Sequence, residues 1–172
     1  MSALSTSPSV QGRSVRMVAA AAAVALAATI IGAWIFQAVG YAPCKLCLEQ
    51  RYAYYAGVPL AALAALSAPS QPKLARLILL IVGLMLAANA VFGVYHAGVE
   101  WGWWAGPTDC SPAGGASALP GQAGNLLQQM QTARVVNCSE AALRILGLSL
   151  AGWNAVICAV LAVVSLRAAA RG

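Results

Sequence analysis

Charged residues are scarce in this chain. Only about 8% of its 172 residues are Asp, Glu, Lys or Arg, and just four are acidic. A soluble domain carries roughly 25% charged and about 45–50% apolar residues, whereas 61% of this chain is hydrophobic. The composition therefore excludes an ordinary soluble domain and indicates a protein of the lipid bilayer.

Clusters of basic residues are also absent. The ten Lys and Arg residues are dispersed along the chain and form no stripe, so the net charge of +6 does not indicate a nucleic-acid partner. A positive charge on a bilayer protein instead reflects its orientation and its attraction to anionic lipid headgroups.

Four stretches are long and apolar enough to cross the roughly 30 Å hydrocarbon core as helices of about 20 residues. They are Met17–Val39, Tyr52–Ala68, Leu74–Tyr95 and Leu146–Leu166. The second stretch alone is near the short limit, so we expect its helix to begin around Cys47. Small residues crowd all four stretches and permit close helix packing in lipid. The prediction is an all-α membrane protein with a bundle of four transmembrane helices.

The basic residues predict the orientation. Six of them, and no acidic residue, fall on one side of the membrane: Arg13, Arg16, Lys73, Arg76, Arg167 and Arg171. The other side carries the remaining four basic residues and all four acidic ones. Because Lys and Arg accumulate on the cytoplasmic side, we expect the acid-free side, with both termini, to be cytoplasmic.

The predicted organisation is a cytoplasmic tail over residues 1–16, one transmembrane domain over 17–166 and a second tail over 167–172. Outer loops lie at about 40–51 and 97–145 within that domain. The first apolar stretch could instead be a cleaved signal peptide, but its run of about 20 residues exceeds the 7–15 of a signal sequence.

Cys44 and Cys47 form a C-x-x-C motif between the first two apolar stretches. This spacing is typical of thiol–disulfide oxidoreductases. A disulfide within so short a segment has little structural value, and the apolar composition excludes a thioredoxin fold. If the second helix starts near Cys44, just after Pro43, both sulfurs lie at the positive end of that helix, where a thiolate is stabilised.

Cys110 and Cys138 flank the long outer loop, whose Gly-, Ala-, Ser- and Pro-rich centre we expect to be flexible. They could form a loop staple worth about 3–4 kcal/mol on a chain-entropy estimate, or act in redox chemistry; the residues alone leave both open. Zinc bound by all four outer cysteines is disfavoured, because the second pair is about 28 positions apart. No metal site is therefore predicted, and Cys158 is interpreted as a buried apolar residue of the last span.

Arg51 and His96 are the candidate binding residues. Arg51 lies four residues after Cys47, on the same helical face, where its permanent charge can stabilise a thiolate or an electron-rich acceptor. The less favoured alternative is that it extends to lipid phosphates. His96, the only histidine, is seven residues after Asn89 and at the outer end of its helix, where it could donate to a quinone carbonyl, pass a proton or simply lie at the interface.

These residues resemble the DsbB disulfide-bond formation proteins of the bacterial inner membrane. The similarity covers four spans and nearly the whole chain. It includes the Pro-Cys-x-Leu-Cys-x-x-x-Arg run at 43–51, Tyr95–Glu100, the Gly106-Pro107 approach to Cys110, and Ser149–Asn154. Cys158 has no counterpart in that family's scheme, and the loop spacing varies among its members.

The resemblance implies an inner-membrane thiol:quinone oxidoreductase with both cysteine pairs in the periplasm. A reduced DsbA-like periplasmic protein would form a mixed disulfide with Cys110, and the released Cys138 would pair with Cys44. Cys47 would then be the thiolate facing the quinone, either ubiquinone or menaquinone, with Arg51 and His96 at the quinone site. The loop would be flexible because Cys138 must travel between Cys110 and Cys44.

Two other functions fit parts of the sequence. Proteins similar to vitamin K epoxide reductase also connect thiols to quinone, but they place C-x-x-C late in the chain, whereas here it opens the second span. A disulfide-stapled membrane scaffold or transport subunit is the non-enzymatic alternative, and it predicts that Cys47→Ser leaves oxidation of the partner protein intact.

Overall fold

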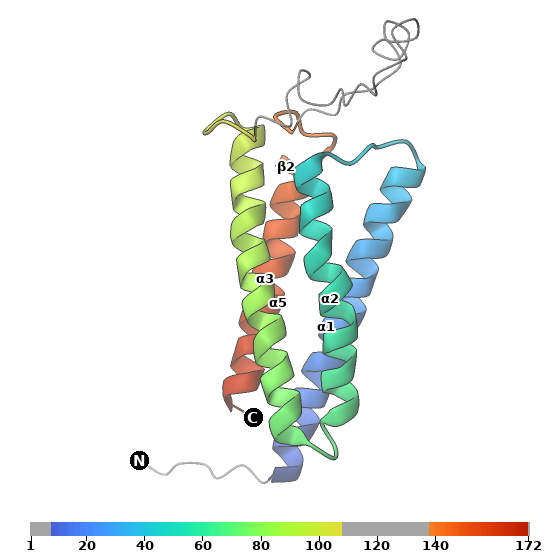
Figure 1. Ribbon diagram of the computed structural model, residues 1–172, viewed down its shortest axis with the longest axis vertical. Coiled ribbons are helices and arrows are strands. Elements are labelled where there is room, and N and C mark those ends of the chain that lie inside the picture. The colour runs from blue at the N-terminus through green and yellow to red at the C-terminus, as the bar shows by residue number, and fades with distance from the viewer. Residues whose placement is uncertain (1–7, 108–137, 172) are drawn as a thin grey trace, which may run out of the picture.

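The computed structural model describes residues 8–107 and 138–171 of the chain. Four helices run along a common axis in Figure 1: α1 (Pro8–Ala38), α2 (Lys45–Ser67), α3 (Pro72–Glu100) and α5 (Leu150–Arg171). A two-stranded antiparallel hairpin, β1 (Arg144–Ile145) and β2 (Leu148–Ser149), precedes the last helix. The helical bundle predicted from the sequence is thus present. The flexible loop centre and Cys110 lie outside the described residues.

Within the described residues, three helical segments are long and apolar enough to cross a membrane: Gly12–Ala38, Pro72–Glu100 and Leu150–Arg171. The prediction of four spans is confirmed only in part, because α2 forms but does not reach the same apolarity. Its N-terminal half carries the polar residues Glu49, Gln50 and Arg51 and several tyrosines, which lower its hydropathy.

The predicted start of α2 is confirmed, whereas that of α5 needs correction. Helix α2 begins at Lys45, close to the expected Cys47, because Cys44 is its N-cap and its sulfur accepts a hydrogen bond from the backbone N–H of Cys47. Helix α5 begins at Leu150 rather than Leu146. Leu146 and Gly147 have positive φ values of 53° and 82°, which close the tight turn of the hairpin and delay the helix.

Small residues set how closely the helices pack. Helix α3 packs most extensively against α5, and α1 against α2. A Cβ added at Gly93 would lie only 3.0–3.1 Å from the Cβ, Cα and N atoms of Ala155, so α3 and α5 approach backbone to backbone there. This agrees with the expectation that small residues bring membrane helices together.

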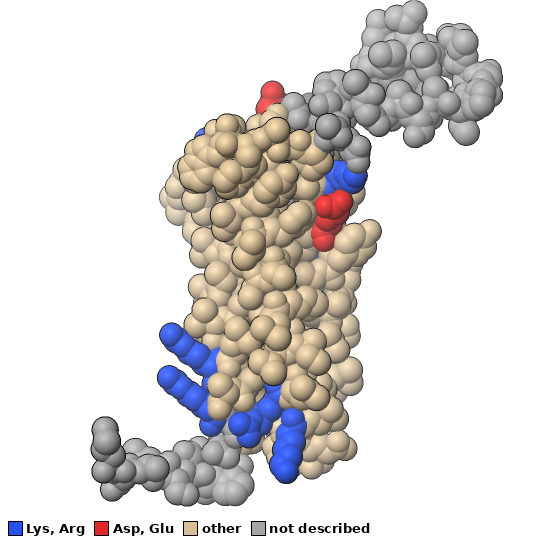
Figure 2. Space-filling model, turned by 60° about the vertical axis from the view of Figure 1, so that its left-hand side comes forward, with Lys and Arg blue, Asp and Glu red and all other residues tan. Residues whose placement is uncertain are grey.

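Charges are divided between the two ends of the bundle. Figure 2 shows most of the Lys and Arg residues in view gathered at one end, whereas Asp and Glu on that face are confined to the opposite end, where a few basic residues also lie. The basic end includes the α2–α3 turn, the start of α3, which carries Lys73 and Arg76, and the C-terminal end of α5. The dithiol motif lies at the other end, because α2 begins there.

Candidate active site

The dithiol motif is built by the first turn of α2. The thiol of Cys44 donates a hydrogen bond to the sulfur of Cys47 across 2.9 Å, and the N–H of Cys47 donates back to the Cys44 sulfur at 3.3 Å. Both cysteines are free thiols in this arrangement. The hydrogen bond makes the two sulfurs unequal, since Cys44 holds the shared proton and Cys47 accepts it.

The pKa of the Cys44 thiol is raised well above its ordinary value. The main cause is the hydrogen bond to Cys47, followed by burial, which disfavours a charged sulfur. Cys44 therefore stays protonated at neutral pH. Cys47, which accepts hydrogen bonds from its neighbour and lies in the first helical turn, is the better placed to carry a negative charge.

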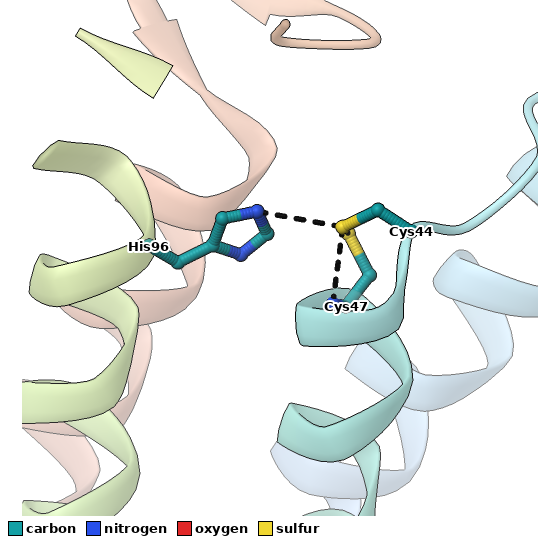
Figure 3. A group of neighbouring side chains, drawn as sticks. All are labelled: Cys44, Cys47 and His96. Atoms are coloured by element: carbon teal, nitrogen blue, oxygen red, sulfur yellow. Dashed lines mark hydrogen bonds between the residues drawn. The ribbon is translucent and has the colours of Figure 1, made fainter. Parts of the chain in front are cut away.

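His96 approaches this pair from α3. Figure 3 shows its ring pointing from α3 across to the Cys44 sulfur, and the Nε2 atom lies 3.5 Å from that sulfur. The ring is only 1% exposed. The sequence prediction placed His96 at the outer end of its helix, and the structure brings it into direct contact with the dithiol.

Cys138 lies next to the same pair. It is 2% exposed and packs in one buried cluster with Cys44, Leu46 and Val99. Unlike Cys44 and Cys47, it is disulfide-bonded. The structure thus brings three of the four predicted redox cysteines together, and the fourth, Cys110, lies outside the described residues.

Cys47 also lines a cavity of about 290 Å³ between α1, α2 and α5. Its wall is mainly apolar, with polar side chains from Gln50, Arg51 and Asn154. The guanidinium of Arg51 donates a hydrogen bond to the Gln37 side-chain oxygen at 2.7 Å, which holds it at the cavity wall. Arg51 and Cys47 thus line the same cavity.

A chain of buried hydrogen bonds connects the dithiol to the bundle interior. The Asn154 amide donates to the Gln50 side-chain oxygen at 2.8 Å, and the Gln50 nitrogen lies 3.1 Å from Nδ1 of His96. With its oxygen accepting from Asn154, Gln50 donates to Nδ1, so the proton of neutral His96 is on Nε2, facing Cys44. Tyr54 extends the chain by donating to Asn154.

This series of hydrogen bonds ends at Cys158, deep in the bundle. Its sulfur lies 3.2 Å from the Tyr54 hydroxyl and accepts from the Asn89 amide at 3.3 Å. Asn89 therefore faces the interior, as expected for a polar residue of a span, but it contacts Cys158 and not the dithiol. Cys158 is fully buried, in agreement with the sequence interpretation.

Sequence reasoning missed Gln50, Tyr54, Asn154 and Glu100 as members of this site. The signal was available, because polar residues in apolar helices usually face the bundle interior. Glu100 lies one turn after His96, with its Oε1 atom 3.8 Å from Nε2, and it accepts a hydrogen bond from Ser149.

Comparison with known proteins identifies the family. The model of the family described as "Disulfide bond formation protein DsbB" matches residues 15–168. The chain belongs to the DsbB family. No match was found among curated proteins or among solved structures. As a DsbB family member with three apolar helices, it is an inner-membrane protein of disulfide bond formation, and the expected activity is that of an oxidoreductase.

Proposed function

We propose that the chain is a thiol:quinone oxidoreductase that reoxidises a periplasmic DsbA-like protein and passes the electrons to membrane quinone. The observation that carries this proposal is the position of Cys47. Its sulfur accepts the hydrogen bond of Cys44 and the residue also lines the apolar cavity, so one residue connects the dithiol to a site suited to a flat, apolar acceptor.

The cavity residues fit a quinone. The apolar wall would take a ring, and the Arg51 guanidinium and the Gln50 and Asn154 amides offer donors for carbonyl oxygens. A bound quinone, ubiquinone or menaquinone, would accept two electrons and two protons. Arg51 would hold the acceptor against Cys47, and its permanent charge would favour the thiolate there.

The cysteines would pass electrons by thiol–disulfide exchange, in which a thiolate attacks a disulfide and releases the second sulfur. A thiolate of the reduced partner attacks Cys110 of the Cys110–Cys138 disulfide, and the Cys138 thiolate leaves. That thiolate attacks Cys44 of the oxidised Cys44–Cys47 pair, and the Cys47 thiolate leaves. The second partner thiol then attacks the mixed disulfide, releases Cys110 and completes the partner's own disulfide.

Two more exchanges return the cysteines to their starting state. The Cys110 thiolate attacks Cys138 and frees Cys44, so the Cys44–Cys47 dithiol holds the two electrons. Oxidation of that dithiol at the cavity regenerates its disulfide. The burial of Cys138 in one cluster with Cys44 supports the exchange between them.

The hydrogen bonds of His96 support a role beside Cys44. In the neutral tautomer inferred above, its Nε2–H points at the Cys44 sulfur across 3.5 Å. A donor in that position would stabilise negative charge that develops on Cys44 when the sulfur is a leaving group.

We further propose that the dithiol end of the bundle faces the periplasm and that both termini are cytoplasmic. The opposite end carries the acid-free group of basic residues, which the positive-inside rule assigns to the cytoplasm.

The redox state of the partner in cells tests this function. Thiol alkylation followed by a gel shift should show the periplasmic DsbA-like protein oxidised with the wild-type chain and reduced with Cys47→Ser. Cys158→Ala is the matched control, because that sulfur lies outside the relay, and it should leave the partner oxidised. A partner that stays oxidised without the chain would overturn the proposal and favour a membrane scaffold.

A further inference from the structure

Three metal-ligating atoms converge at the outer end of the bundle. The sulfurs of Cys44 and Cys47 and a ring nitrogen of His96 all lie within 4.8 Å of one another. Figure 3 shows His96 reaching from α3 toward the two cysteines, of which Cys47 is in the first turn of α2 and Cys44 just precedes that helix. This set differs from the four-cysteine zinc site that the sequence spacing disfavoured, because a histidine from α3 replaces the second cysteine pair.

A buried carboxylate oxygen beside this group has no partner. Glu100 Oε2 is inaccessible to solvent and makes no hydrogen bond to the described residues. The other oxygen, Oε1, lies 3.8 Å from His96 Nε2. An unpartnered buried carboxylate oxygen is costly unless a cation or a hydrogen-bond donor satisfies it.

We propose that the reduced Cys44–Cys47 pair, with His96 and Glu100, forms a site for a divalent cation of the zinc class. Two sulfurs, one imidazole nitrogen and one carboxylate oxygen are ligands that zinc and cadmium accept in a tetrahedral arrangement. Cys44 and His96 are buried and Cys47 is half-buried, and the site lies outside the cavity proposed for the quinone, apart from the shared Cys47.

The two sulfurs and the histidine nitrogen need only small adjustments, whereas Glu100 lies beside this group of three and must turn its carboxylate toward it. Tetrahedral zinc with Zn–S bonds of about 2.3 Å and Zn–N bonds of about 2.0–2.1 Å separates its ligand atoms by roughly 3.5–3.8 Å. The Cys44 sulfur is already 3.5 Å from His96 Nε2, and the two sulfurs must move apart from 2.9 Å. The latter movement follows from loss of the proton between them.

Gln50 can support the histidine as a ligand. When Nε2 binds a metal, the ring proton is on Nδ1, which faces the Gln50 side-chain amide at 3.1 Å. Rotation of that amide presents its oxygen to Nδ1. The Asn154 amide rotates with it, so that its oxygen accepts from the Gln50 nitrogen and its nitrogen donates to the Tyr54 hydroxyl, which can donate to Cys158. Such a partner fixes the tautomer and orientation of a metal-bound histidine.

The site depends on the redox state of the pair. Binding replaces the thiol protons that the pair still holds by the metal and releases them to solvent, with no electron transferred. A Cys44–Cys47 disulfide leaves no thiolate to bind. A bound cation therefore holds the pair reduced, prevents Cys47 from reacting with quinone at the cavity and inhibits turnover.

Metal titration of the purified full-length protein in detergent tests this site. After reduction and removal of the reductant without air, Cd²⁺ should bind with a thiolate-to-metal charge-transfer absorption in the ultraviolet, at one equivalent per chain. Zn²⁺ should displace it. Wild type with its cysteines oxidised should not bind, and this comparison needs no substitution.

The Cd²⁺ affinity of substituted proteins distinguishes binding at this site from binding at the other thiols. Cys44→Ser and Cys47→Ser should abolish tight binding, His96→Gln should weaken it more than Glu100→Gln, and Glu100→Gln should cost roughly 10–100-fold in affinity. Cys158→Ala and Cys138→Ser should bind as wild type does. The inference is wrong if reduced wild type binds no Cd²⁺, or if His96→Gln and Glu100→Gln both bind with unchanged affinity, which would show a simple dithiol chelate.

The outcome of the metal titration does not depend on whether the protein transfers electrons to quinone. Cadmium binding requires neither quinone nor a partner protein, so it can succeed where turnover fails and fail where turnover succeeds.

Discussion

The Cys44 thiol donates a hydrogen bond to the sulfur of Cys47, and the two atoms lie 2.9 Å apart. The pair therefore shares one proton unequally. Cys44 is the protonated member beside His96 and Cys138, whereas Cys47 lines the cavity. This asymmetry gives each sulfur a different neighbour to react with.

The unequal sulfurs should be visible in alkylation. Because the pKa of Cys44 is raised, mainly by its hydrogen bond to Cys47, iodoacetamide at neutral pH should label Cys47 first. Cys47→Ser removes the thiolate acceptor, so the pKa of Cys44 should fall and its labelling should begin at lower pH. Mass spectrometry over a pH series measures this, and an unchanged pH profile of Cys44 in the variant would contradict it.

Arg51 should strengthen the binding of quinone in the cavity. Arg51→Gln removes a permanent charge from the cavity wall and a hydrogen bond to Gln37. Hydrogen bonds of charged groups contribute about 1.5–3 kcal/mol, so the KM for quinone should rise about tenfold or more. Lys73→Gln, an exposed charge at the opposite end, should leave the KM unchanged. A KM for Arg51→Gln within twofold of wild type would exclude this role.

Gly93 should be intolerant of any side chain. A methyl group there would meet Ala155 at 3.0–3.1 Å and push α3 away from α5. Overpacking of this kind lowers the free energy of unfolding by about 1–3 kcal/mol. Gly32→Ala in α1 is the matched control, because a Cβ there has no atom within 4 Å. It should be neutral or stabilising by up to about 1 kcal/mol through helix propensity. Thermal unfolding in detergent distinguishes the two, and equal midpoints would refute the close approach.

The buried hydrogen-bond chain should contribute to stability. Tyr54→Phe removes the hydroxyl that contacts Asn154 and Cys158, and hydrogen bonds between membrane helices contribute about 0.6–2 kcal/mol. Tyr52→Phe, on the same helix but 69% exposed, is the control and should change little. The free energy of unfolding in mixed micelles is measured for both variants. A decrease in Tyr52→Phe as large as that in Tyr54→Phe would argue against a stabilising role of the buried hydrogen bonds.

The sequence was sufficient for the helical bundle and for the dithiol at the start of α2, because apolar length and the C-x-x-C spacing are local signals. The hairpin before α5 was not predictable, since Leu146 has a backbone conformation that leucine seldom adopts. Local spacing also could not specify which polar side chains meet. Asn89 and His96 share a helical face, yet one contacts Cys158 and the other Cys44, because α5 and α2 supply different partners along that face.

The central claim is that electrons pass from a protein dithiol through Cys47 to quinone. The most direct test follows quinone absorbance with the purified protein in detergent and a reduced DsbA-like dithiol as donor. Wild type and Cys158→Ala should turn over, whereas Cys44→Ser, Cys47→Ser and Cys110→Ser should fall to background. Turnover by Cys47→Ser at the wild-type rate, or none by wild type with either ubiquinone or menaquinone, would contradict the account.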